Sequence, residues 1–172
     1  APTPTINESM TKVMEPDAQV IWDITSGAFN DKGDGLVASK ISEDQWTKLA
    51  QAGQRIRDRA AQLGAAKHVT VATPDQAVMG AYASHAGAKG TYDAASVRQI
   101  QAAIDGNPAL FKKRMKILEQ AGDTVVKSAD AKDAALLYSV SSNLDEVCDG
   151  CHQPFWGTDE NPPFPGSGAP VK

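Results

Sequence analysis

The chain has 172 residues, 41% of them hydrophobic and 22% charged, which suits a single globular domain. Its net charge of −4, without a basic patch, argues against a nucleic-acid binder. It contains no run of about 18 apolar residues of the kind that spans a membrane. Abundant alanine with only 6% aromatic residues favours packed helices over sheets.

The first predicted helix runs from Ile6 to about Ile24. Its apolar residues recur at intervals of three, four and seven, which is the pattern of one helical stripe. Pro16 interrupts the stripe, and we expect it to kink or restart the helix because proline has no N–H to donate. The run 30–35 (NDKGDG) is typical of a loop.

The second predicted helix runs from about Glu43 to Leu63 and ends at Gly64. It begins with a capping-box pattern, Ser42 followed three residues later by Gln45. Such a pair satisfies two backbone N–H groups at the start of a helix, so we expect a well-defined beginning here.

Residues 65–106 are less regular than the rest of the chain. Thr73-Pro74 predicts the start of a short helix, with proline at its first position. The stretch 79–90 is rich in small residues and stays ambiguous. Asp93 to Ile104 has helical spacing again, and Asp105-Gly106 ends it.

The last two predicted helices are long. One begins at Asn107-Pro108, a capping side chain followed by a first-turn proline, and a weak break follows at 128–132. The other runs from about Asp133 to Phe155. Residues 157–172 hold four Pro and three Gly, which predicts an irregular or disordered tail.

These elements predict an all-α fold, an antiparallel four-helix bundle with an extended helical insertion between the second and third long helices. We expect one domain, residues 1–156, with the insertion at about 65–106, and a separate Pro/Gly-rich tail at 157–172. The chain as printed contains no signal-peptide pattern, and we interpret its start, Ala1 to Pro4, as that of a mature exported form.

The only two cysteines, Cys148 and Cys151, are spaced C-x-x-C and are followed at once by His152. Positions i, i+3 and i+4 of a helix share a face, so all three side chains can point at one group. This pattern is typical of covalent haem attachment, because cysteine thiols add to the haem vinyl groups as thioethers and the histidine offers its imidazole to the iron.

Three other interpretations of the motif compete with haem attachment. A thioredoxin-like dithiol expects a βαβ context, which this chain does not offer. A zinc site needs four ligands, and only His68 and His85 remain to complete one. In a third interpretation the motif has no function, and two buried cysteines lie beside a helical histidine by chance. The complete pentapeptide favours one covalent haem c.

The motif lies near the C-terminus, on the last of the four long helices. On that evidence the chain resembles a class II cytochrome c, the cytochrome c prime family. The resemblance covers Ile6 to Trp22 and Asn107 to Trp156, while residues 65–106 depart from the family. It implies a four-helix bundle with one covalent haem. Because haem c is attached outside the cytoplasm in bacteria, we expect a periplasmic protein.

The resemblance also implies that the iron position opposite His152 is faced by the first helix. Low-spin members of the family place a Met there, and high-spin members an apolar residue. Met10 and Met14 lie one turn apart, about 6 Å along the axis, so only one of them can coordinate the iron.

The segment from Met10 to Trp22, with Pro16 and Ala18 between them, resembles a pattern of the low-spin branch and favours Met10 as the distal ligand. Met14 and an iron without a sixth protein ligand stay open, since a Met on an amphipathic face is most often core filler. Met79 and His85, in the insertion, are weaker candidates.

We therefore predict a single-electron carrier rather than an enzyme. Its acidic charge favours a redox partner protein, not identified by the sequence, with a positive docking patch. The alternative is a high-spin, five-coordinate protein that binds nitric oxide or carbon monoxide. Family members often pair through their first two helices, so the resemblance leaves a homodimer open.

Several other side chains have structural interpretations. We expect aromatic residues to form the core or haem wall or to close the haem edge: Trp22, Trp46, Phe111, Phe155 and Trp156. We expect basic residues of the second and third helices to lie on solvated helix faces, with haem propionates as alternative partners: Arg55, Arg57, Arg59, Lys113 and Arg114.

Overall fold

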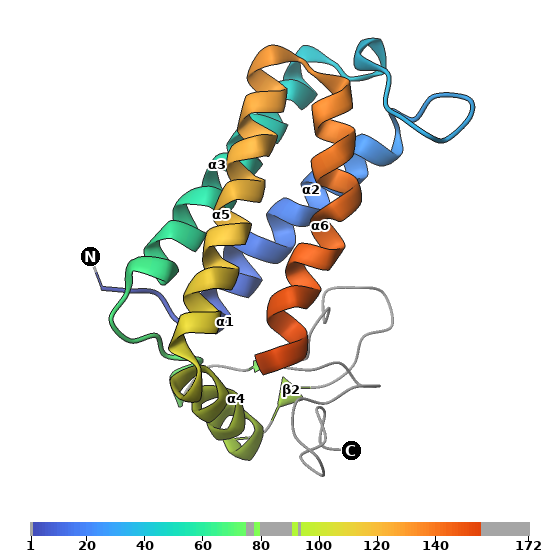
Figure 1. Cartoon of the computed structure of the whole chain (residues 1–172). Helices are drawn as coiled ribbons and strands as arrows, with labels where there is room; N and C mark the ends of the chain where they lie inside the picture. Colours follow the sequence, from blue (N-terminus) through green and yellow to red (C-terminus); the bar gives the residue numbers. More distant parts are fainter. Residues whose placement is uncertain (1, 75–77, 80–90, 93, 156–172) are drawn as a thin grey trace.

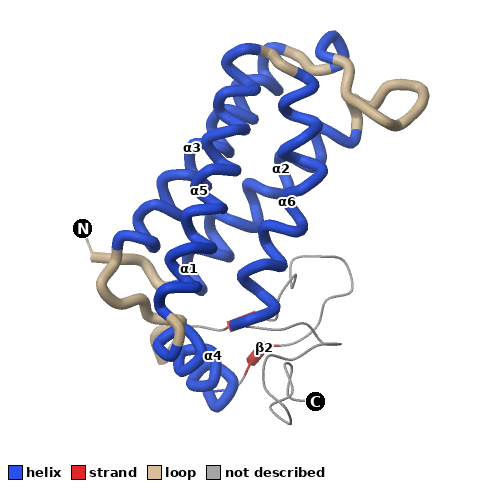
Figure 2. Tube along the Cα trace, in the orientation of Figure 1, coloured by secondary structure: helices blue, strands red, loops and turns tan. Residues whose placement is uncertain are grey.

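The structure is a computed structural model that describes residues 2–74, 78–79, 91–92 and 94–155. Helices make up most of these residues, which confirms the all-α prediction (Figures 1 and 2). None of the helices described is both long and apolar enough to cross a bilayer. The predicted tail at 157–172, together with Trp156, lies outside the described residues.

The first predicted helix is continuous but changes type. It consists of α1 (Ile6–Ser9), a π-helical segment η1 (Met10–Met14) and α2 (Glu15–Ser26). Within η1 the Glu15 N–H donates to the Met10 carbonyl, five residues back rather than four. The α-helical pattern is thus interrupted directly before Pro16, as predicted, because its ring would collide with a carbonyl in the preceding α-helical turn.

The next helix, α3 (Glu43–Ala65), begins where the capping box predicts. The Gln45 N–H donates to Ser42 Oγ at 3.2 Å, and Gln45 Oε1 accepts from the Ser42 N–H at 2.9 Å. The helix continues past Gly64, the predicted end. The loop before it is closed by a bridge between Phe29 and Leu36, followed by the 3₁₀ turn η2 (Ala38–Lys40).

The insertion contains two short antiparallel strands, β1 (Val78–Met79) and β2 (Thr91–Tyr92), and the helix α4 (Ala94–Gly106). The short helix predicted here is therefore confirmed. No helix begins at Thr73 or Pro74 within the described residues, and 75–77 lie outside them. The ambiguous stretch 79–90 lies outside them too, apart from its first residue.

The insertion is joined to the first helix through the backbone. The N–H groups of Ile6 and Asn7, which have no partner within their own helix turn, donate to the carbonyls of Thr70 and Val71, both at 2.9 Å. The side chain of Gln101 on α4 bonds to the same segment, accepting from the Val71 N–H at 2.8 Å. This segment therefore links α1 to α4.

The last two helices are α5 (Pro108–Ala131) and α6 (Ala134–Phe155). As predicted, the Asn107 side chain caps α5, accepting from the Leu110 N–H at 3.2 Å. The break between the helices is made by Lys132, which has a left-handed backbone with φ of 50°. Asp133 then caps α6 by accepting from the Leu136 N–H at 2.9 Å.

The long helices pack along one another (Figure 2). Helix α3 lies along α5, α5 packs on α6, and α2 packs on both α3 and α6. Asp17 on α2 is buried and accepts from the Arg55 guanidinium of α3 at 2.6 Å. Helix α4 contacts α5 and α6 at the end where α6 terminates (Figure 1).

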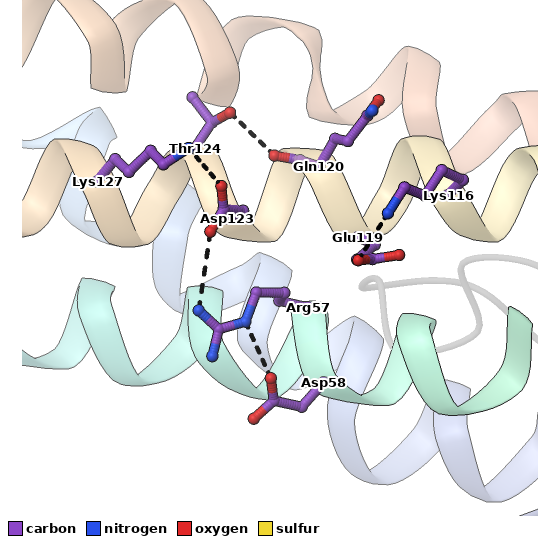
Figure 3. A network of polar contacts seen from close by, with 8 residues as sticks. All are labelled: Arg57, Asp58, Lys116, Glu119, Gln120, Asp123, Thr124 and Lys127. Atoms are coloured by element: carbon purple, nitrogen blue, oxygen red, sulfur yellow. Dashed lines mark hydrogen bonds and ion pairs between the residues drawn. The ribbon is translucent and has the colours of Figure 1, made fainter. Parts of the chain in front are cut away.

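The closest approach is between α3 and α5. A Cβ added to Gly122 would lie 2.7 Å from the Gly53 carbonyl oxygen and 2.7 Å from the Arg57 backbone nitrogen. Beside this crossing, Arg57 bonds to Asp58 at 2.9 Å and reaches Asp123 of α5 at 3.8 Å (Figure 3). Only glycine allows the two backbones to approach this closely.

Candidate functional site

The last two turns of α6 carry the cysteine and histidine motif. Cys148, Cys151 and His152 all lie within α6, so their spacing places them on one helix face. All three are half-buried, and the two cysteines pack against the hydrophobic core. The aromatic residue beyond them, Phe155, is buried and meets Phe111 edge-on, with ring centroids 5.9 Å apart.

The surroundings keep both thiols protonated. Burial raises the pKa of Cys148 to about 12, and the carboxylates of Asp145 and Glu15 add to the effect. Burial also raises the pKa of Cys151 to about 12, with Cys148 adding to it and the positive charge of Arg114 opposing it. At neutral pH the motif therefore presents two neutral thiols.

The imidazole of His152 is kept neutral. Burial lowers its pKa below the ordinary value, while the negative charges of Asp149 and Glu15 act in the opposite direction. Neutral imidazole has the free lone pair that a metal ion needs. The environment thus favours the form of His152 that can act as a ligand.

Glu15 shows that the first helix faces the motif, because its charge acts on both Cys148 and His152. Met10 and Met14 occupy the π-helical segment that ends directly before it. Their burial differs: Met14 is 6% exposed and belongs to the core, whereas Met10 is half-buried against its edge. The structure therefore brings α2, which begins directly after the segment that contains both candidate distal ligands, against α6 and its motif.

Arg114 on α5 lies at the motif, whereas the sequence analysis expected it on a solvated helix face, with a haem propionate as the alternative partner. A Cβ added to Gly150 would lie 2.9 Å from Nη1 of Arg114, so the guanidinium rests on the helix backbone between the two cysteines. Arg114 is half-buried, and the prediction of a solvated helix face is wrong for it. The available signal was its helical position, three residues after Phe111 and beside Met115, at the border of the apolar stripe.

The other basic residues have partners elsewhere. Arg55 binds Asp17, Arg57 binds Asp58 and Asp123, and Arg59 donates to the buried Ser9 hydroxyl at 3.2 Å. Lys113 is exposed, as expected of a solvated face. The propionate alternative therefore finds no support at the three arginines of α3.

The donor set fits haem better than a bare metal ion. Within the described part of the chain, no three His, Cys, Asp or Glu side chains gather as a metal site. His68 pairs with Asp105 at 3.4 Å, and His85 lies outside the described residues. Haem iron is already held by its porphyrin and needs only one or two protein ligands, which His152 and a methionine can supply.

Comparison with known proteins returns no similar protein. No protein-family model, no curated protein and no solved structure matches the chain. The function is therefore inferred from the residues of the motif and from their surroundings.

Proposed function

We propose that this protein is a monohaem c-type cytochrome of class II that carries single electrons in the periplasm. The observation that carries the proposal is the placement of Cys148, Cys151 and His152 on one half-buried face at the end of α6. The two thiols would hold one haem c through thioether bonds, and His152 would be its proximal iron ligand. When bound, the haem supplies a reversible one-electron couple between ferric and ferrous iron.

The protein's own residues bind and orient the group. The two cysteines, one turn apart on a helix, would fix one edge of the macrocycle to α6. His152 is held neutral by burial, so it can bind iron without first losing a proton. The buried pair of Phe111 and Phe155 keeps water from the core side of the motif.

We propose Met10 as the distal ligand. It lies on the segment that precedes Glu15, and its half-buried side chain is not enclosed by the core as that of Met14 is. Single π-helical turns are frequently found at functional sites, where they change the direction of side chains. A thioether ligand favours ferrous iron and raises the reduction potential, which suits an electron carrier.

The proposal includes the architecture and the partner. The antiparallel four-helix bundle of the family would consist of the first helix (α1, η1 and α2 together), α3, α5 and α6. Helix α4 would be an insertion at the haem end of this bundle. The net charge of −4 favours a redox protein with a positive docking patch. The resemblance to class II cytochromes also implies that pairing through the first two helices should be tested.

The test is the absorption spectrum of protein produced in a host that attaches haem c. Spectra are recorded in the ferric and dithionite-reduced forms, with and without carbon monoxide. We expect sharp reduced bands, a weak far-red thioether-to-iron band in the ferric form and no shift with carbon monoxide. A broad high-spin spectrum that shifts with carbon monoxide would replace electron transfer by gas binding. A chain that retains no haem after denaturation would refute the whole proposal.

A further inference from the structure

The position of Arg114 is not explained by packing alone. Its Nε atom is buried and has no hydrogen-bond partner among the residues that the structure describes. A buried, unpaired donor on a charged group costs free energy, so its position calls for a physical reason. The guanidinium lies on Gly150, within the helical C-x-x-C-H motif itself.

Glycine at position 150 is what makes this contact available. A Cβ there would come within 2.9 Å of Nη1 and 3.3 Å of Cζ of Arg114. The contact therefore depends on both residues, one on α5 and one on α6. It holds a positive charge beside Cys151, whereas the negative charges of Glu15, Asp145 and Asp149 act on Cys148 and His152.

We propose that Arg114 is a positioning residue that sets the reduction potential of the haem by holding a fixed positive charge against the attachment motif. This inference rests on the proposed function. Oxidation removes one electron from ferrous haem, passes it to the redox partner protein and leaves one more positive charge on the iron. A guanidinium held nearby disfavours that added charge and so favours the ferrous form.

The expected size of the effect follows from Coulomb's law. Two unit charges about 10 Å apart, at an effective dielectric constant of about 20, change an equilibrium constant roughly tenfold. For a one-electron couple a tenfold change corresponds to about 59 mV. Half-buried charges are screened less by salt than exposed ones, so much of the effect should persist at physiological ionic strength.

The test is a potentiometric titration of the haem-loaded protein and four variants. Arg114→Met should lower the equilibrium constant for reduction roughly tenfold, while Arg114→Lys, which keeps the charge, should retain most of it. Lys113→Met, at the exposed neighbouring position, is the matched control and should change the constant less than twofold. Reduced spectra of all variants should keep the wild-type bands, which shows that the iron ligands are unchanged.

Gly150→Ala supplies an independent variant that retains Arg114 but moves its guanidinium away from the motif. The added methyl displaces only the far end of a flexible side chain, so the protein should fold and its potential should fall by less than in Arg114→Met. If the Arg114→Met protein does not accumulate, the Gly150→Ala variant decides. A fall in its reduction potential larger than that of Lys113→Met supports the inference, and a fall no larger than that of Lys113→Met overturns it.

Two further outcomes overturn the inference while the proposed function stands. One is a shift in Arg114→Met no larger than that in Lys113→Met. The other is an equal shift in Arg114→Lys and Arg114→Met, which would assign the effect to packing rather than charge. Absence of covalent haem in the wild-type protein would instead remove the proposed function, and this inference with it.

Discussion

Helix α5 meets two very different surfaces. Around Gly122 it lies directly on the backbone of α3, and a Cβ there would collide with atoms that cannot move. Around Arg114 it faces the motif end of α6, where an added Cβ on Gly150 would meet only the end of a long side chain. The first surface is closed by backbone contact, and the second is held by side chains that can move.

The burial of polar groups differs in the same way. At the α3–α5 crossing the charged groups form pairs on the outside, as Arg57 does with Asp58 and Asp123 (Figure 3). The end of α6 instead gathers several polar groups that are half-buried. They are the two neutral thiols, the neutral imidazole of His152 and the Nε atom of Arg114 from α5, which has no hydrogen-bond partner among the described residues. Burying such groups costs free energy unless a partner compensates them, and the proposed haem would be that partner.

The largest effect is expected when the motif loses its thiols. Replacing both Cys148 and Cys151 by Ala should abolish covalent haem attachment completely, because no other cysteine exists in the chain. The α3–α5 crossing is untouched, so the variant should keep its helical circular dichroism. Haem staining after a denaturing gel measures the loss, and stained variant protein would contradict the assignment.

The two methionines of the π-helical segment should separate into ligand and core. Met10→Ala should convert the iron to high spin and lower its potential, since the thioether would be lost. Met14→Ala should leave the spectrum unchanged but lower the free energy of unfolding by about 2–5 kcal/mol, because Met14 is buried. Spectra and denaturant titrations of both variants check this, and the reverse pattern would make Met14 the ligand.

Replacing glycine by alanine should cost much more stability at Gly122 of α5 than at Gly150 of α6. Gly122→Ala forces α3 and α5 apart and should cost about 1–3 kcal/mol of stability. Gly150→Ala moves only the Arg114 side chain and should stay within about 1 kcal/mol of the wild type, because alanine also favours the helix. Thermal unfolding of both variants measures the difference, and equal losses would show that the motif end is as rigid as the crossing.

A further effect is expected from alkali on the haem-free chain. The folded thiols have a pKa of about 12 against an ordinary value of 9.0, so between these values the unfolded chain binds fewer protons than the folded one. Stability should therefore fall as the pH rises from 9 towards 12. Thermal midpoints of the haem-free chain measure this fall.

The matched control is the Cys148→Ala, Cys151→Ala variant, in which part of that alkaline fall should disappear. The same part of the alkaline fall should be absent from the haem-loaded protein, because a thioether has no proton to release. Identical pH profiles for the haem-free chain and the variant would show that folding does not raise the pKa of the two thiols.

The helix boundaries were largely predictable because they depend on local chemistry. Ser42 with Gln45 and Asn107 with Pro108 satisfy backbone groups of their own helix turns, so the residues themselves mark where α3 and α5 begin. Pro16 marks the change of helix type because it has no N–H to donate and its ring collides with the preceding α-helical turn. The motif is equally local, since three residues within five positions share one face of α6.

What the sequence could not supply is which residues from other helices meet the motif. That Arg114 rests on Gly150, and that Glu15 lies close enough to act on Cys148 and His152, depends on how α5 and α2 pack against α6. Gly53 and Gly122 are unremarkable residues until two helices bring them together. The sequence by itself determined the helices and the motif because these arise from neighbouring residues. Asp145 and Asp149 are local to the motif, but only the tertiary structure decided that the charges of Glu15 and Arg114 meet it, because both residues lie more than thirty positions away in the sequence.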